Sequence, residues 1–131
     1  MQKAKTKAKK KKSNLVITSK GRAYVTCTYN NTLITITNDK GDVVAWTNPG
    51  AVGFTGARRS TPYAASLAAE SAAKKALEKG VNTVEIITKG PGSAKISAIK
   101  SLKTAGLKIV SIKDVTPLPH NGCRAKKKRR V

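Results

Sequence analysis

A segment rich in glycine and arginine, residues 50–62, carries the strongest local signal for anion binding in this sequence. It holds three glycines at intervals of three, then two arginines, then a serine at the predicted start of a helix: Gly50, Gly53, Gly56, Arg58, Arg59 and Ser60. Glycine lets one backbone approach another closely, and the forked guanidinium donors suit phosphate oxygens. Free N–H groups and the dipole at a helix start favour anions. The simpler interpretation is a glycine-rich connector with two solvated arginines. It does not explain why the glycines, the arginines and the helix start lie together in one segment.

A second segment repeats this arrangement more weakly. Two glycines lie between a predicted strand and a predicted helix and are flanked by lysines: Lys89, Gly90, Gly92 and Lys95. No Gly-Lys-Ser/Thr closes the segment, so it is not a Walker loop, and the glycines of the first segment do not match the dinucleotide-binding fingerprint. An ordinary turn between strand and helix explains the second segment equally well.

Two pairs of residues predict exposed turns. Asn30 and Asn31 separate two strand-like runs, and asparagine tolerates the positive φ of a two-residue turn. Their amides could donate to phosphate or to base edges. Asn121 and Gly122 form a flexible pair prone to deamidation, which marks Asn121 as a candidate modification site.

Positive charge is concentrated at both ends of the chain. The formal net charge is +21, and residues 1–13 contain seven lysines and no acidic residue. Residues 124–131 contain six basic residues and no acidic one: Arg124, Lys126, Lys127, Lys128, Arg129 and Arg130. Such segments repel themselves and bury nothing, so we expect them to be disordered in the free protein. Basic ends also occur as solubility devices or import signals, but a phosphate polymer makes best use of both ends and a basic body.

Composition argues against several other classes of protein. No apolar run is long enough for a membrane span or a signal peptide, because Leu15-Val16-Ile17 is too short. We therefore expect a cytoplasmic protein that acts without a membrane. One histidine, two cysteines and six acidic residues without a motif do not support catalysis, a metal, another cofactor or a small-molecule substrate. Cys27 lies in a strand-like pattern and is expected to be a buried thiol.

The elements that must position these residues follow the order β-β-β-α-β-α-β. The first half predicts an antiparallel meander with strands at residues 22–29, 32–37 and 43–46. In the second half, Thr61 and Pro62 predict the start of a helix that runs to about Lys79 and stops at Gly80. A strand at residues 81–88, a helix capped by Ser93 and ended by Gly106, and a strand at residues 107–113 complete the order. The pattern predicts an α/β fold with a mixed sheet and parallel crossovers.

An alanine stripe on the first helix indicates close approach to the sheet. The stripe at helical spacing comprises Ala65, Ala69, Ala72, Ala73 and Ala76. We expect one domain over residues 14–116, a disordered basic arm over residues 1–13 and an extended basic tail over residues 117–131.

Four stretches together resemble a known family. They are Tyr29-Asn-Asn-Thr32, Gly53-Phe-Thr-Gly-Ala-Arg-Arg-Ser-Thr-Pro-Tyr-Ala-Ala65, Lys89-Gly-Pro-Gly92 and Asp114-Val-Thr-Pro-Leu-Pro-His-Asn-Gly-Cys-Arg124. With the basic end, they resemble bacterial small-subunit ribosomal protein eleven over nearly the whole chain from Arg22. After Lys89-Gly-Pro-Gly92 the family commonly continues Pro-Gly-Arg, whereas Ser93-Ala94-Lys95 follows here.

The resemblance implies a fold, a function and partners. The fold is of ribonuclease-H-like topology without that enzyme's carboxylates, and the function is non-enzymatic binding of 16S rRNA in the platform of the small ribosomal subunit. The implied neighbours are the ribosomal proteins numbered seven and eighteen, near the path of messenger RNA at the exit side. Carried over by motif, the RNA-facing residues are Asn30, Asn31, Gly53 to Ser60, Lys89 to Gly92, and His120, Asn121, Gly122 and Arg124. Lys95 would keep the charge of the family's arginine without its forked donor.

Two alternatives remain open on the sequence. A small basic protein that compacts DNA nonspecifically would share the charge but would not need a structured glycine–arginine segment. A metal-dependent nuclease would need clustered carboxylates, for which no motif is present.

Overall fold

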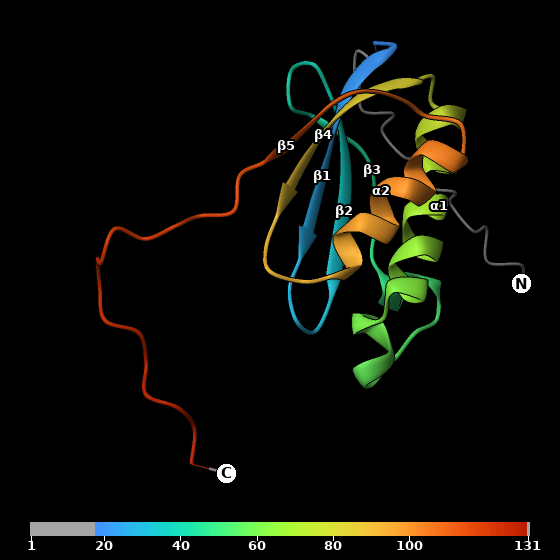
Figure 1. The fold of residues 1–131 in the computed structure, drawn as a ribbon. Coiled ribbons are helices and arrows are strands. Elements are labelled where there is room, and N and C mark those ends of the chain that lie inside the picture. Colours follow the sequence, from blue (N-terminus) through green and yellow to red (C-terminus); the bar gives the residue numbers. More distant parts are fainter. Residues whose placement is uncertain (1–17, 131) are drawn as a thin grey trace, which may run out of the picture.

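Five strands and two helices form the described part of the chain. The computed structural model describes residues 18–130; the predicted basic arm at residues 1–13, the four residues after it and residue 131 lie outside the described range. The elements are β1 (Lys20–Cys27), β2 (Thr32–Asn38), β3 (Val43–Thr47), η1 (Pro49–Val52), η2 (Gly56–Ser60), α1 (Pro62–Glu78), β4 (Thr83–Lys89), α2 (Ala94–Thr104) and β5 (Lys108–Asp114). The predicted order is confirmed, with two short 3-10 helices added between β3 and α1 (Figure 1).

The strands form one mixed sheet in the order β3-β2-β1-β4-β5. β2 pairs antiparallel with β1 and β3, whereas β4 pairs parallel with β1 and β5. β2 therefore runs against the other four strands, which share one direction. This is the antiparallel meander followed by parallel crossovers that the sequence predicted, in the ribonuclease-H-like order that the resemblance implied.

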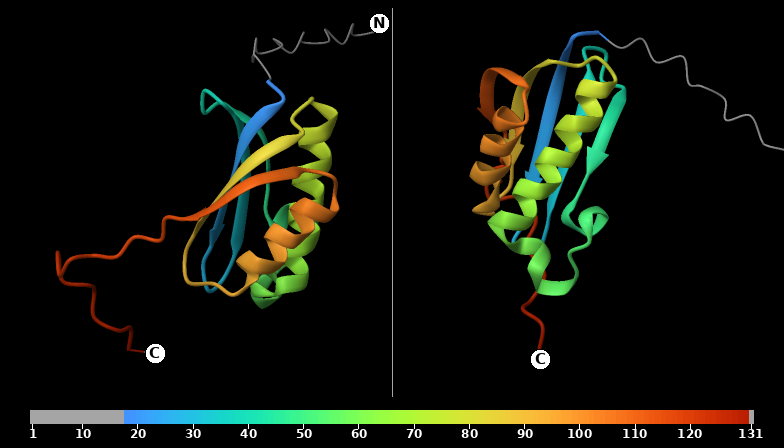
Figure 2. Two further views of the ribbon diagram at one scale, coloured as in Figure 1. Left: turned by 45° about the horizontal axis from the view of Figure 1, so that its top comes forward. Right: turned by 90° about the vertical axis from the view of Figure 1, so that its right-hand side faces the viewer.

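Both helices cover the same face of the sheet. The crossover from β3 through α1 to β4 and the crossover from β4 through α2 to β5 proceed in the same direction across the sheet. Crossovers of one hand that proceed in one direction place their helices on one face, and α1 and α2 lie side by side there (Figure 2). Among the described residues no helix covers the other face, where Trp46 is 60% exposed.

Alanine lines the contact between α1 and the sheet. The seven buried alanines of the helix are Ala64, Ala65, Ala68, Ala69, Ala72, Ala73 and Ala76. All of them except Ala64 belong to one buried cluster with aliphatic side chains of the sheet, among them Val25, Ile34 and Ile36. The predicted stripe is confirmed and is wider by Ala64 and Ala68, because α1 packs closely against α2 as well as against the sheet.

The two helix starts differ from each other. The Thr61 hydroxyl accepts a hydrogen bond from the N–H of Ala64 at 3.3 Å, and Pro62 occupies the first helical position, as predicted. Ser93 precedes α2 but makes no capping hydrogen bond, so the predicted cap is wrong. Its backbone is helical, with φ −76° and ψ −18°, instead of the extended form that directs a side chain back over the first turn.

The first hairpin connection is longer than predicted. β1 ends at Cys27, so Tyr29 lies in the connection instead of the strand, and its side chain is 77% exposed. Neither Asn30 nor Asn31 has a positive φ, so the predicted two-residue turn is wrong. The N–H of Thr28 instead donates to the carbonyl of Asn31 at 2.8 Å, and the Thr28 hydroxyl accepts the N–H of Asn31 at 3.1 Å; together these bonds close a four-residue connection.

The close packing of α1 gives a testable prediction. Ala72→Leu should lower the free energy of unfolding by about 1–3 kcal/mol, because the larger side chain has no space between the helix and the sheet. Lys75→Leu places the same side chain on the exposed side of the helix and should change stability by less than about 0.5 kcal/mol. Urea denaturation of the two variants measures the difference, and equal stabilities would contradict close packing.

Candidate nucleic-acid interface

The segments predicted to bind RNA gather at one end of the sheet. Each follows the carboxyl end of one of the four strands that share a direction: residues 28–31 follow β1, residues 48–61 follow β3, residues 90–93 follow β4 and residues 115–130 follow β5. We call this end of the sheet the carboxyl end. It is the lower end of the blue and yellow strands in Figure 1, where the glycine–arginine segment also lies. Segments far apart in sequence thus form one surface, as ligand-binding loops do in open α/β sheets.

Acidic residues are nearly excluded from this end. Asp39 and Asp42 lie in the β2–β3 turn at the opposite end of the sheet, and Glu78 ends α1 on that same side. Glu70 lies along α1 in an ion pair with Lys74, and Glu85 lies within β4 in an ion pair with Lys113. Among the described residues, Asp114 is the one acidic residue at the carboxyl end. The separation leaves this end strongly cationic.

Both helices also begin at the carboxyl end, so their positive dipole ends point toward it. Neither helix has an acidic residue in its first turn. The Ser93 hydroxyl makes no capping bond at α2, which leaves the N–H groups of the first turn without the partner that a serine cap provides. Two helix N-termini and several basic side chains therefore favour anions on the same surface.

The glycine–arginine segment is ordered by local contacts. The Asn48 side chain accepts a hydrogen bond from the N–H of Ala51 at 2.8 Å and begins η1. The Phe54 ring meets the Tyr63 ring edge-on at 6.0 Å between centroids, which fastens the segment to the start of α1. Within this chain no backbone packs against Gly53 or Gly56, because added Cβ atoms there would meet open space, so the predicted close approach of another backbone stays a prediction. Their φ angles of +100° and +57° explain the glycines.

The two arginines present their charge without an acidic partner. Arg58 is exposed and Arg59 is half-buried, and neither forms an ion pair with any of residues 18–130. The Arg59 Nε donates to the carbonyl of Gly56 at 3.2 Å, which holds the guanidinium against the segment. The remaining guanidinium nitrogens stay available for an external acceptor.

The β1–β2 connection offers one free amide. The Asn31 side chain accepts the N–H of Thr32 at 2.9 Å and so helps to shape the connection. Asn30 is exposed, and no contact within the described residues engages its side chain. Tyr29 stands beside it as an exposed ring on which a base could stack. Sequence reasoning placed Tyr29 in a strand, although its position directly before two asparagines is itself a turn signal.

Close backbone packing occurs in the second loop. A Cβ at Gly90 would overlap the carbonyl oxygen of Cys27, and one at Gly92 would overlap the Cys27 sulfur. The N–H of Gly92 donates to that carbonyl at 3.3 Å. Gly92 is buried, so these glycines hold the loop against the end of β1, and the exposed Lys89 is the side chain that faces outward.

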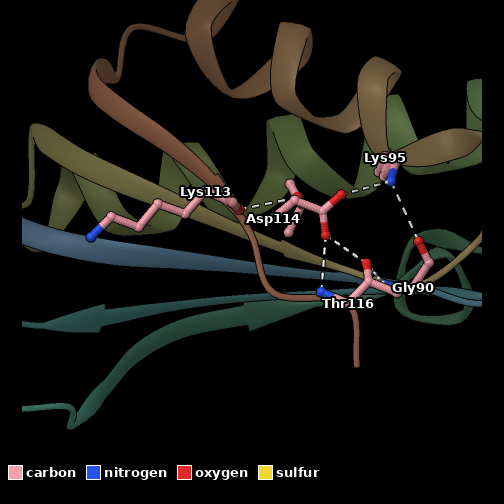
Figure 3. A network of polar contacts seen from close by, with 6 residues as sticks. Gly90, Lys95, Lys113, Asp114 and Thr116 are labelled. Atoms are coloured by element: carbon pink, nitrogen blue, oxygen red, sulfur yellow. Dashed lines mark hydrogen bonds and ion pairs between the residues drawn. The ribbon is translucent and has the colours of Figure 1, made fainter. Parts of the chain in front are cut away.

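Asp114 links this loop to the C-terminal tail. Its carboxylate accepts the hydroxyl of Thr116 at 2.5 Å and the N–H of Thr116 at 2.9 Å, and Lys95 lies 3.3 Å away (Figure 3). The Thr116 hydroxyl accepts the N–H of Gly90 at 3.2 Å. The Thr116 hydroxyl and N–H, with a smaller contribution from Lys95, lower the pKa of Asp114 from 3.8 to about 2. Lys95, predicted as an RNA ligand, neutralises this carboxylate.

The tail carries the other predicted residues into solvent. Most of residues 117–130 are exposed, they contain no helix or strand, and the chain leads away from the domain (Figure 1). Asn121 has a positive φ of 56°, which bends the tail. The remaining predicted residues are thus spread along one extended length of chain and form no cluster: His120, Gly122, Arg124, Lys126, Lys127, Lys128, Arg129 and Arg130. Cys123 lies among them as an exposed free thiol.

The described residues form a small basic α/β domain with a cationic surface at one end of its sheet, the charge pattern typical of proteins that bind nucleic acid. Among residues 18–130 there is no group of three or more side chains that could hold a metal ion, and no helix is long and apolar enough to cross a membrane.

The comparison with known proteins identifies the family. The sequence model of the family described as "Ribosomal protein S11" matches residues 21–130. The chain is 52% identical over 130 residues to "Small ribosomal subunit protein uS11" of Christiangramia forsetii, covering 98% of each chain. It is 50% identical over 125 residues to the protein of the same name from Flavobacterium psychrophilum, covering 95% of this chain and 98% of the relative. The chain belongs to the ribosomal protein S11 family of the small ribosomal subunit, whose members are structural and non-enzymatic.

The Asp114 contacts give a prediction with a defined sign. Thr116→Val removes the hydroxyl at nearly constant volume and should raise the pKa of Asp114 from about 2 toward 3.8. Because the pKa is lowered in the folded protein, the stabilisation is complete above about pH 4 and is lost as the pH falls through about 2. Carbon-13 NMR of the carboxyl group measures this. Thr104→Val is the control, since its hydroxyl bonds only the Lys100 carbonyl; an unchanged pKa in Thr116→Val would contradict the assignment.

Proposed function

We propose that the carboxyl end of the sheet is the surface through which this protein binds 16S rRNA in the platform of the small ribosomal subunit. The observation that carries the proposal is the meeting of four connections, two helix N-termini and unpaired arginines at one end from which acidic residues are nearly excluded. Membership of the S11 family supplies the ribosomal setting.

Recognition uses phosphates and RNA shape more than base sequence. Arg58 and Arg59 bind phosphate oxygens on the domain, and Lys89 adds charge farther along the same end of the sheet, at the end of β4. The exposed amide of Asn30 donates to phosphate or to a base edge, and the ring of Tyr29 provides a local stacking surface. Gly90 and Gly92 act indirectly, because they hold the loop that carries Lys89 against β1.

The tail and the basic arm extend the bound surface. Residues 117–130 leave the domain next to the β4–α2 loop, to which Asp114 and Thr116 fasten the start of the tail. From there the basic side chains thread between RNA helices and neutralise phosphates that the domain cannot reach. The lysines of residues 1–13 act in the same way on another part of the RNA.

The proposed neighbours follow from the family resemblance. The ribosomal proteins numbered seven and eighteen lie next to this protein in the platform, and messenger RNA passes near it at the exit side. Crosslinking from the tail in assembled small subunits, followed by identification of the partners, tests these contacts one by one.

Nonspecific DNA compaction is the competing function. A DNA-compacting protein binds duplex DNA and rRNA alike, whereas a surface shaped for folded RNA prefers the rRNA. Competition at equal nucleotide concentration separates the two, and displacement from a 16S rRNA fragment by excess duplex DNA would refute the proposal.

The arginines provide a prediction of binding strength. Replacing Arg58 and Arg59 by alanine should weaken binding to a 16S rRNA platform fragment and reduce the salt slope by roughly 0.7–0.9 for each phosphate that is no longer neutralised. Fluorescence anisotropy over a series of KCl concentrations measures the slope. The control replaces Lys74 and Lys75 by alanine, which removes the same charge far from the carboxyl end. Its salt slope should stay steeper than that of the Arg58 and Arg59 double variant. Equal slopes in the two double variants would contradict the assigned surface.

The tail provides a second prediction. Replacing Lys126, Lys127, Lys128, Arg129 and Arg130 by glutamine should reduce rRNA affinity and the salt slope, because fewer phosphates are neutralised. Thermal unfolding of the free protein should stay unchanged, since these side chains are exposed. A chain ending at Arg124 should behave in the same way. Wild-type affinity in the glutamine variant would show that the charge of the tail does not bind the RNA.

A further inference from the structure

We propose that the groove between α2 and β5 binds an amphipathic helix with acidic flanks that another protein supplies. The groove has a volume of about 550 Å³ and is formed by the second half of α2, the α2–β5 turn and the first part of β5. It uses none of the residues assigned to the RNA surface, so the two proposals stand independently.

The groove exists because the helix layer stops short of the sheet edge. β5 is the edge strand, and no element of residues 18–130 follows it across the sheet. Ile109 and Ile112 pair with Val84 and Ile86, which are buried beneath the helices, so all four side chains share the helix-covered face. Ile112 is nevertheless 57% exposed. The face that α1 and α2 cover elsewhere is open over β5.

The floor of the groove is aliphatic. Ile99 and Leu107 line it from the helix and the turn, and Ile109, Val110 and Ile112 line it from the strand. Val110 is 68% exposed. Ile112 is also exposed, Ile99 and Ile109 are half-buried and Leu107 is buried, so the apolar floor opens to solvent along β5. Exposed apolar side chains next to a partly covered floor mark a surface that a partner covers.

The shape of the edge favours a helix as the occupant. The register between β4 and β5 shifts after Ile109, so Val110 has no partner in β4 and forms a bulge. A bulge interrupts the straight ladder that an added strand requires. A helix packs on side chains and needs no ladder, and about fifteen helical residues match the roughly 23 Å length of β5. The occupant therefore takes the place of a third helix beside α2.

The charge around the groove defines the chemistry of that helix. Lys100, Lys103 and Lys108 form its rim and are exposed. None of them forms an ion pair within the described residues. Acidic side chains flanking an apolar stripe complement this rim. RNA fits less well, because the aliphatic floor offers no ring for base stacking and would remove phosphates from water.

Peptide binding tests the chemistry of the groove on the full-length protein. The probe is a sixteen-residue peptide with leucine on one helical face and glutamate on the other, and fluorescence anisotropy measures its binding. Ile112→Asp should weaken binding at least about tenfold, because it removes apolar surface and repels the glutamates. Val43→Asp makes the same change of charge at an exposed β-branched residue of the opposite edge strand and should leave the affinity unchanged. Lys103→Glu repeats the test on an exposed side chain of α2, where folding is not at risk.

Equal affinities for the Ile112→Asp and Val43→Asp variants would overturn the proposal, as would equal binding of a peptide with lysine in place of glutamate. Binding of the 16S rRNA fragment should be unaffected by Ile112→Asp, which separates this inference from the RNA surface. In assembled small subunits, a photo-crosslinking residue introduced at position 112, on the helix-covered face, should attach to an acidic amphipathic helix of a protein. Attachment to RNA, or to no macromolecule, would refute the assignment.

Discussion

The common direction of β1, β3, β4 and β5 governs the rest of this structure. Strands that share a direction place their carboxyl ends together, and so four connections from distant parts of the sequence meet at one end. The same direction makes both crossover helices run back against these strands, so that their N-termini arrive at that end as well, and both crossovers proceed the same way across the sheet, so the helices share one face. The alanine face of α1 lets the helix lie close enough to the sheet for this arrangement to hold. Electrostatic asymmetry is thus a product of topology before any single side chain contributes.

Asp114 shows how such a cationic end accommodates a carboxylate. An unpaired acid here would repel every phosphate brought to the surface. The Asp114 carboxylate is instead bound by the hydroxyl and N–H of Thr116 and by the ammonium of Lys95. Because the Thr116 hydroxyl also accepts the N–H of Gly90, these contacts connect the β4–α2 loop to the start of the tail. The basic tail therefore starts from a defined point on the domain, although its later residues contact solvent.

Sequence periodicity was sufficient for the order of elements, the alanine stripe and the cap at Thr61, because each depends on contacts a few residues apart. It failed where side chains redirect the backbone: Thr28 and Asn31 reshape the first connection, and Ser93 adopts a helical backbone that removes its cap. The glycine–arginine and β4–α2 segments were recognised, but the local reasons for their glycines were not. Gly53, Gly56 and Gly90 have positive φ angles, and Gly90 and Gly92 also pack on the end of β1. That packing joins residues far apart in the chain, which no local pattern reveals.

The packing of Gly92 on Cys27 also decides which of the two thiols can react with reagents in solution. Cys27 is 1% exposed, and its sulfur lies 3.4 Å from the Thr32 hydroxyl with the loop backbone above it. Alkylating reagents and oxidants thus find one accessible sulfur among the two cysteines, that of Cys123 in the tail. The natural protein consequently offers a single attachment point for a fluorophore or spin label, on the segment whose path through a ribonucleoprotein is of greatest interest.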